Sequence, residues 1–326
     1  MPRLLSSILL VTLFGSSYSL AADLTQAVSA FNDGRAAVAK PVFEGAVKDP
    51  ASKNEALFYL GRIAFEEGDA EKAKELLSDA VALEPNSSDE YYWLGRAYGE
   101  LALKANVLKQ ASYASSVHKY FQLAVDTDPR NVPALRGLFE FYVVAPSIMG
   151  GSVESAEQTI AAIRKLSSVD ADIKQLSLLG KKRETEKRLA HARLLVATYP
   201  DSAEALFEAA HVLREQKQLP EAITAFEAAA KISPTRSNKI FVENSAYYFS
   251  ETCQWANVRL DDAIKNLEKI IAVRTGEKSF NKNWPLWTLA KLYRQKGDVQ
   301  KFTALKAQLD PAYIKNDKFL KAELDK

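Results

Sequence analysis

The apolar residues of segment 56–85 follow two short helical patterns with a turn between them. Apolar positions recur at helical spacing over residues 57–65 and again over 70–83, with Gly68 between the runs and Pro85 after the second. This pattern predicts two antiparallel helices, each with one apolar face. One pair of this length cannot bury both faces alone, so it requires similar neighbours.

The neighbouring segments repeat this pattern with a period of 34 residues. One period downstream, the residues that match Leu60, Gly61 and Arg62 are Leu94, Gly95 and Arg96. One period upstream, the residues that match Gly68, Ala73, Leu77 and Ala80 are Gly34, Ala39, Phe43 and Ala46. A fixed period of this size predicts a solenoid, because each unit buries its apolar face only against copies of itself.

Small residues occur where two helices of a pair must approach closely. Gly61 and Ala64 lie near one side of the first helix, and Ala73 and Ala80 lie on one side of the second. Together with Leu60, Leu77 and Pro85, this set resembles the tetratricopeptide repeat (TPR) family. The resemblance implies an all-α fold, a right-handed α-solenoid of antiparallel helix pairs, with about seven or eight units and a C-terminal capping helix.

The resemblance extends over residues 22–326, which we interpret as a single TPR-like solenoid. The clearest repeats are 54–87, 88–130 and 203–236, and the weaker ones are 22–53, 131–168, 169–202, 244–277 and 283–316. Two segments exceed the repeat, a helical insert at 101–112 and a loop at 145–152. Each is either a functional element on a rigid scaffold or a tolerated insertion.

The N-terminus has the layout of a secretory signal peptide. Residues 1–21 contain one Arg, an apolar run from Leu4 to Phe14, and small residues before Ala21, after which we expect cleavage. The apolar run is shorter than a membrane span requires, so we expect no transmembrane span in the mature chain. The expected location is outside the cytoplasm, either the bacterial periplasm or the secreted fraction. Cys253 is the only cysteine, so the exported fold must hold without an intrachain disulfide.

Charge and motifs exclude several classes of function. The 43 basic and 41 acidic residues give a formal net charge of +2, without the basic excess that nucleic-acid backbones require. His118, His191 and His211 are isolated in the sequence and show no metal-ligand spacing. Cys253 lies in an apolar helical segment, where a buried inert thiol is expected. We therefore expect no catalytic site, no metal and no cofactor; an enzyme acting through Cys253 or a histidine is the least favoured alternative.

Surface recognition remains the predicted activity. In the related family the first helices of successive pairs line a concave groove, and helical spacing assigns ten residues of this chain to that face. They are Phe58, Arg62, Tyr92, Arg96, Phe139, Phe207, His211, Tyr248, Trp287 and Lys291. Basic residues beside aromatic ones suit an acidic or C-terminal peptide segment. The alternative is that each Arg pairs with a nearby Glu, such as Glu55, Glu66 or Glu100.

The sequence thus predicts an exported, non-enzymatic scaffold or adaptor that binds a protein or peptide in the groove of a TPR solenoid. The competing hypothesis is a structural accessory subunit of an envelope assembly or secretion machine. Such a subunit would act through its convex edges and through the segments 101–112 and 145–152. Removing the insert, rather than changing the groove, should then abolish association.

Overall fold

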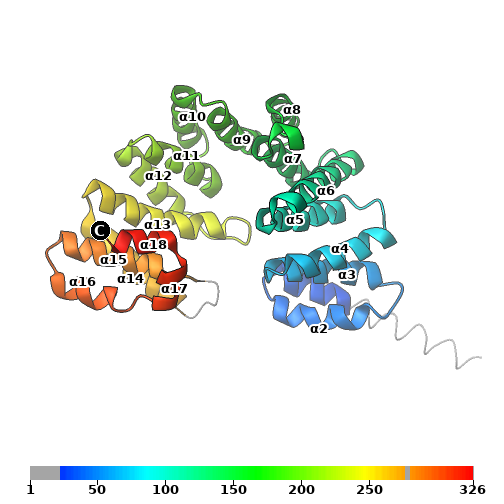
Figure 1. Cartoon of the computed structure of the whole chain (residues 1–326), viewed down its shortest axis with the longest axis horizontal. Helices are drawn as coiled ribbons and strands as arrows, with labels where there is room; N and C mark the ends of the chain where they lie inside the picture. The colour runs from blue at the N-terminus through cyan, green and yellow to red at the C-terminus, as the bar shows by residue number, and fades with distance from the viewer. Residues whose placement is uncertain (1–22, 276–279, 326) are drawn as a thin grey trace, which may run out of the picture. The chain divides into compact units, whose positions relative to one another are not determined.

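A computed structural model describes residues 23–275 and 280–325. Within these ranges the regular structure is entirely helical, and successive helices pack as antiparallel pairs (Figure 1). The predicted all-α solenoid fold is therefore confirmed. The chain divides into two compact units, residues 1–174 and 175–326, and the boundary lies inside helix α9. The prediction of one continuous solenoid stays a prediction, and the predicted signal peptide lies outside the described residues.

Unit 1 begins with a helix over residues 23–32. Its further elements are α2 (Ala36–Ala46), α3 (Lys53–Glu66), α4 (Ala70–Leu83), α5 (Ser88–Lys104), α6 (Val107–Thr127), α7 (Val132–Val144), the 3₁₀ turn η1 (Ser147–Met149), α8 (Val153–Arg164) and α9 (Ser168–Lys181), which continues into unit 2. The pairs α3 with α4 and α5 with α6 make the most extensive contacts of this unit.

Glycine packing explains why Leu-Gly recurs in the first helices of unit 1. A Cβ atom on Gly61 would lie 2.6 Å from Leu77 Cγ, and one on Gly95 would lie 2.8 Å from Phe121 Cδ1. A large residue of the second helix thus fills the space that each glycine leaves on the first. The interlocking that the sequence pattern predicted is present in both pairs.

The insert at 101–112 lengthens both helices of its pair. Helix α5 has 17 residues and α6 has 21, whereas α3 and α4 have 14 each. The break between α5 and α6 falls at Ala105 and Asn106, and the Asn106 side chain accepts a hydrogen bond from Lys109 N–H at the start of α6. The predicted extra helical turns, shared between the two helices, are therefore confirmed.

The loop 145–152 has a defined backbone. Gly150 has a φ of 97°, which a residue with a side chain rarely adopts. A Cβ on Gly151 would lie 1.8 Å from the carbonyl oxygen of Ala145, so the backbone passes too close to itself there for any other residue. The loop holds Ile148 at 92% exposure.

Unit 2 continues the pairs from α9. Its helices are α10 (Thr185–Thr198), α11 (Ala203–Glu215), α12 (Leu219–Lys231), α13 (Lys239–Ala256), α14 (Leu260–Arg274), α15 (Asn283–Gln295), α16 (Val299–Lys306), α17 (Pro311–Asn316) and α18 (Lys318–Leu324). Two turns of unit 1 have a glycine at positive φ, Gly34 and Gly68, whereas three turns of unit 2 have other residues there, namely Arg183, Lys217 and Asn257. The missing glycine weakens the sequence signature of the repeats 169–202 and 244–277, whereas the repeat 203–236 stays clear in spite of Lys217.

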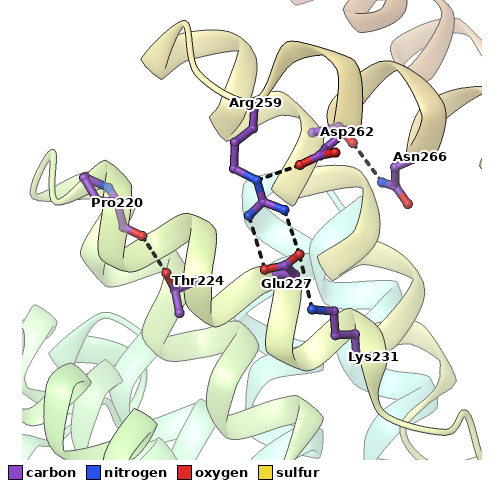
Figure 2. A network of polar contacts seen from close by, with 8 residues as sticks. Pro220, Thr224, Glu227, Lys231, Arg259, Asp262 and Asn266 are labelled. Carbon is purple, nitrogen blue, oxygen red and sulfur yellow. Dashed lines mark hydrogen bonds and ion pairs between the residues drawn. The ribbon is translucent and has the colours of Figure 1, made fainter.

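The α13–α14 turn has no glycine, and a network of polar contacts centred on Arg259 holds it (Figure 2). Arg259 precedes α14 with a φ of 50°, and its guanidinium donates to Glu227 Oε1 at 2.8 Å and to Glu227 Oε2 at 3.2 Å. It also donates to Asp262 Oδ2 at 2.8 Å, and Lys231 lies 3.3 Å from Glu227. The bidentate pair ties this turn to α12 of the preceding pair and offsets part of the cost of the left-handed backbone at Arg259.

The C-terminal cap differs from the single helix that the sequence predicted. The polypeptide folds there into two short helices, α17 and α18, which meet at Asp317. The Asp317 carboxylate accepts from Leu320 N–H and from the indole N–H of Trp284, so it both caps α18 and ties it to α15. Leu320 is fully buried in the cap. The break occurs because one carboxylate satisfies both a helix end and a tertiary contact.

Candidate peptide-binding surface

Two arginines of unit 1 face the same indole ring. Arg62 Cζ lies 4.7 Å from the ring centroid of Trp93, and Arg96 Cζ lies 4.4 Å from it. Arg96 Cζ also lies 4.3 Å from the centroid of Phe65. Arg62 covers the buried ring of Phe31 as well, at 4.7 Å. We call the partly buried residues that form this site the arginine–aromatic surface: Phe58, Tyr59, Arg62, Phe65, Tyr92, Trp93 and Arg96.

Helical spacing on α3 and α5 explains why these residues meet. Phe58 and Phe65 lie four residues before and three residues after Arg62, so all three share one face of α3. Tyr92 and Trp93 precede Arg96 by four and three residues on α5 in the same way. The opposite faces of both helices carry the buried residues Leu60, Gly61, Leu94 and Gly95, whereas the side chains of this face are only partly buried.

The chemistry of the surface is that of cations placed over aromatic rings. A guanidinium that lies over a ring uses its π-face, and such a contact contributes about 0.5–2 kcal/mol. Its N–H donors lie in its own plane, so they can still form a fork with a carboxylate. Among the described residues, Arg96 forms no ion pair with a carboxylate. The alternative that Arg96 simply pairs with Glu100 is therefore not what this structure shows.

In unit 2 the predicted residues Phe207, His211 and Tyr248 come together in one aromatic cluster. The ring centroids of His211 and Tyr248 are 4.4 Å apart, and those of His211 and Phe207 are 4.5 Å apart. Burial, together with the nearby Arg214 guanidinium, lowers the pKa of His211 to about 4. The imidazole is therefore neutral at pH 7, and His211 does not add a positive charge to the predicted basic row.

Three other predicted residues are not open to a ligand. Phe139 is fully buried, and Trp287 is only 4% exposed, so both side chains belong to the core rather than to a groove. Their helical spacing was correct, but neighbouring helices cover the face. Lys291 is mostly buried and its Nζ lies 3.6 Å from Glu323 Oε2 near the C-terminus. Lys291 therefore forms an ion pair with the C-terminal helix α18.

Sequence reasoning missed the residue on which the surface is centred. Trp93 follows the predicted Tyr92 directly, and its position three residues before Arg96 was the available signal. Unit 2 contains a similar contact, because Arg214 Cζ lies 3.7 Å from the ring centroid of the exposed Trp255. There, however, the guanidinium is bound by Glu251 at 2.5 Å, and both side chains are 11% exposed. This second arginine is therefore already neutralised.

The residues weighed for other chemistry have structural partners. His118 Nε2 lies 3.1 Å from the hydroxyl of Tyr142, and its ring packs on Phe141. Burial raises the pKa of the Cys253 thiol to about 11, so the reactive thiolate is scarce at neutral pH. In the described part of the protein, no three His, Cys, Asp or Glu side chains gather as a metal site would require. None of the helices described there has the length and apolar composition of a membrane span.

The fold defines a class of protein, an all-α repeat protein. Sequence comparison agrees with the fold: the tetratricopeptide repeat family matches residues 24–90, and a second family profile of the same name matches residues 203–236. The two matched segments include α3 and α4 of unit 1 and α11 and α12 of unit 2. They support the assignment to tetratricopeptide repeats that the sequence pattern suggested.

Two known structures and one curated protein are similar to this chain, each over a different length. Yeast Tom70 superposes with a TM-score of 0.66 at 16% identity, over 88% of this chain and 59% of that one. A tetratricopeptide repeat protein from Parabacteroides merdae superposes with a TM-score of 0.55 at 15% identity, over 84% and 99%. Cellulose synthase operon protein C of Escherichia coli K12 is 32% identical over 123 residues. That alignment covers 35% of this chain and only 10% of the curated relative.

Proposed function

We propose that this protein is a non-enzymatic scaffold that binds a protein or peptide segment on the arginine–aromatic surface of unit 1. One observation carries the proposal: the guanidinium groups of Arg62 and Arg96 both lie over the ring of Trp93. Aromatic residues and arginine are the side chains that most often dominate binding energy at protein interfaces. The tetratricopeptide repeats and the solenoid fold supply a rigid frame for this surface.

The preferred ligand is an extended segment with at least one carboxylate. Arg96 retains in-plane donors that no described carboxylate occupies, and the rings of Phe65 and Trp93 supply apolar area beside it. The carboxylate of an Asp or Glu residue and the terminal carboxylate of a peptide meet this geometry equally well. Binding through charge-assisted bonds should weaken as salt rises.

Capture of partners by charge-matched variants tests this proposal. The mature protein is crosslinked in its compartment as the wild type and as the double variant Arg62→Gln/Arg96→Gln. The control double variant Lys72→Gln/Lys74→Gln changes the net charge equally on α4, where the two lysines pair with Glu75 and Glu71 of the same helix. We expect partners to be lost from the arginine variant alone, with both variants folded by circular dichroism. Equal capture by the arginine variant and the wild type would remove the surface from consideration.

We also propose that the protein acts outside the cytoplasm, in the bacterial periplasm or in the secreted fraction. The support is the charged, apolar and small-residue order of residues 1–21. Cell fractionation followed by N-terminal sequencing checks this proposal. We expect a mature protein that starts at Ala22, and an intact Met1 in the cytoplasm would contradict it.

A second candidate function is that of an accessory subunit of an envelope assembly or secretion machine, which associates through the insert and the loop. Two exposed apolar side chains favour it, Leu103 at 74% exposure near the end of α5 and Ile148 at 92% in the loop 145–152. The double variant Leu103→Asp/Ile148→Asp leaves the arginine–aromatic surface intact. If this candidate is correct, that variant loses its assembly whereas Arg62→Gln/Arg96→Gln keeps it, and the opposite pattern supports the scaffold.

A further inference from the structure

One carboxyl group of unit 1 is buried where three helices meet. Glu90 lies in the first turn of α5 and is only 4% exposed. The side-chain amide of Asn54, in the first turn of α3, forms a hydrogen bond with this carboxyl group. The same amide donates to the carbonyl oxygen of Ala80, near the end of α4, at 2.9 Å. Glu90 Oε2 has no hydrogen-bond partner in the described part of the chain, so the junction is poorly suited to hold a negative charge.

The charges that act on this carboxyl group are both negative. They belong to Glu84, the C-cap residue of α4, and to Asp89 on α5, whereas α3 contributes the uncharged amide of Asn54. Burial raises the pKa of Glu90 to about 7, and the two carboxylates add to the shift. The group is therefore mostly neutral one pH unit below this value and mostly ionised one unit above it.

The interface that contains Glu90 also carries the arginine–aromatic surface. Trp93 follows Glu90 by three residues, one turn along α5. The Trp93 ring lies 4.7 Å from Arg62 Cζ and 5.6 Å from the ring of Phe65, and both contacts cross from α5 to α3. The contact of Trp93 with Arg96 stays within α5. The assembled surface therefore depends on how closely α5 packs on α3.

Hydrogen bonds hold the first turn of α5 on its other side. Ser88 Oγ donates to the carbonyl oxygen of Ala124 in α6 at 2.7 Å. Asn131, the N-cap residue of α7, donates from Nδ2 to Ser88 Oγ at 2.8 Å and to Asp89 Oδ1 at 3.2 Å. An unfavourable charge on Glu90 is therefore relieved more easily by separating α5 from α3 than by separating it from α6 and α7.

We propose that Glu90 is a pH switch for the arginine–aromatic surface, which binds its partner when the carboxyl group is protonated and loses affinity when it is ionised. Ionisation adds a buried, incompletely bonded charge beside Glu84 and Asp89, and water reaches that charge when α5 moves away from α3. The movement separates Trp93 from Arg62 and so takes the surface apart. This inference rests on the proposed function, because it concerns binding at the same surface.

Amide hydrogen exchange tests the movement without a partner. The mature protein and its Glu90→Gln variant are compared side by side at each pH, because intrinsic exchange itself accelerates as pH rises. At about pH 8.5 we expect residues 57–66 of α3 and 92–100 of α5 to exchange at least about threefold faster in the wild type than in the variant. At about pH 6 the two proteins should exchange alike. Glu100→Gln, on the same helix, is the control and should follow the wild type.

Peptide binding tests the consequence for the surface. The probe is a fluorescein-labelled peptide of about ten residues with alternating Leu and Glu and a free C-terminal carboxylate, followed by fluorescence anisotropy. Its carboxylates and the arginines keep their charges between about pH 6 and about pH 8.5. We expect the wild type to bind at least about fivefold more weakly at the higher pH, and Glu90→Gln to change by less than about twofold. Glu100→Gln should keep the pH dependence of the wild type.

The variant Arg62→Gln/Arg96→Gln separates failure of the switch from failure of the proposed function. If it binds the probe as well as the wild type at about pH 6, the proposed function is wrong and the switch falls with it. If binding requires the arginines but the wild type binds equally at both pH values, only the switch is overturned. The same pH dependence in Glu90→Gln, or equal exchange of wild type and Glu90→Gln at the higher pH, would also overturn it.

Discussion

Replacing Glu90 by glutamine should stabilise the protein in a pH-dependent way. Glu90 lies in the first turn of α5, is only 4% exposed, and has one carboxylate oxygen, Oε2, that is buried without a hydrogen-bond partner among the described residues. Burial raises its pKa from an ordinary 4.5 to about 7, and the negative charges of Glu84 and Asp89 act in the same direction. A hydrogen bond from Asn54 of α3 opposes them.

The magnitude follows from linkage between protonation and folding. A pKa raised from 4.5 to about 7 corresponds to about 3 kcal/mol of stability lost when the carboxyl ionises in the folded state. The sign is fixed because the folded state holds the proton more tightly than the unfolded state. The loss is absent below the unfolded pKa, develops as pH rises through the window between the two values, and is complete above about 7.

Urea unfolding at two pH values measures the effect. We expect Glu90→Gln to raise the free energy of unfolding by about 2–3 kcal/mol near pH 8 and by much less near pH 4.5. At the lower pH the Glu90 carboxyl is protonated in the folded wild type, so it is neutral like the glutamine of the variant. Glu100→Gln, on the same helix, is the control and should change it by less than about 0.5 kcal/mol. A gain from Glu90→Gln that is no larger at the higher pH would refute the reasoning.

Backbone and packing positions allow further tests by urea unfolding. Gly61→Ala should cost about 1–3 kcal/mol, because the new methyl would lie 2.6 Å from Leu77 Cγ. Gly99→Ala should raise the free energy of unfolding by about 0.5–1 kcal/mol, because alanine favours a helix over glycine and nothing lies within 4 Å of the new methyl. Equal effects of Gly61→Ala and Gly99→Ala would contradict the close contact between Gly61 and Leu77. Lys217→Gly should raise the free energy of unfolding by about 1 kcal/mol, because glycine adopts the φ of 58° at this position without strain. A lower free energy of unfolding would show that contacts of the Lys217 side chain outweigh the backbone strain. Gly151→Ala should disorder the loop 145–152, and unchanged amide exchange in that loop would contradict the expectation.

The candidate binding surface was only partly predictable. Helical spacing placed Phe58, Arg62, Tyr92 and Arg96 on one side of α3 and α5, and the structure brings them together around Trp93. The same spacing applied to Trp287 selected a core residue. Period and phase identify a helix face, but only the neighbouring helices decide whether that face is open or covered.

The protonation state of His211 could not be predicted from the sequence either. His211 shares its position in the repeat with Arg62 and Arg96, and its residue type alone allows a positive charge. Three surrounding aromatic rings and Arg214 make the neutral form dominant, because removing water penalises the charged imidazole. The environment that causes this is assembled from α11, α12 and α13, which are separate in the sequence.

The sequence by itself determined the repeat, its length and the helical pairs, because these follow from short-range periodicity and from small residues at fixed spacing. It also determined that the insert at 101–112 lengthens two helices, since that segment keeps the helical period without a breaker. Only the tertiary structure decided which faces remain exposed, that Trp93 joins two arginines, and that Phe139 and Trp287 lie in the core. The reason is that exposure and cavity shape depend on the fit of several helices at once, which no single helical pattern contains.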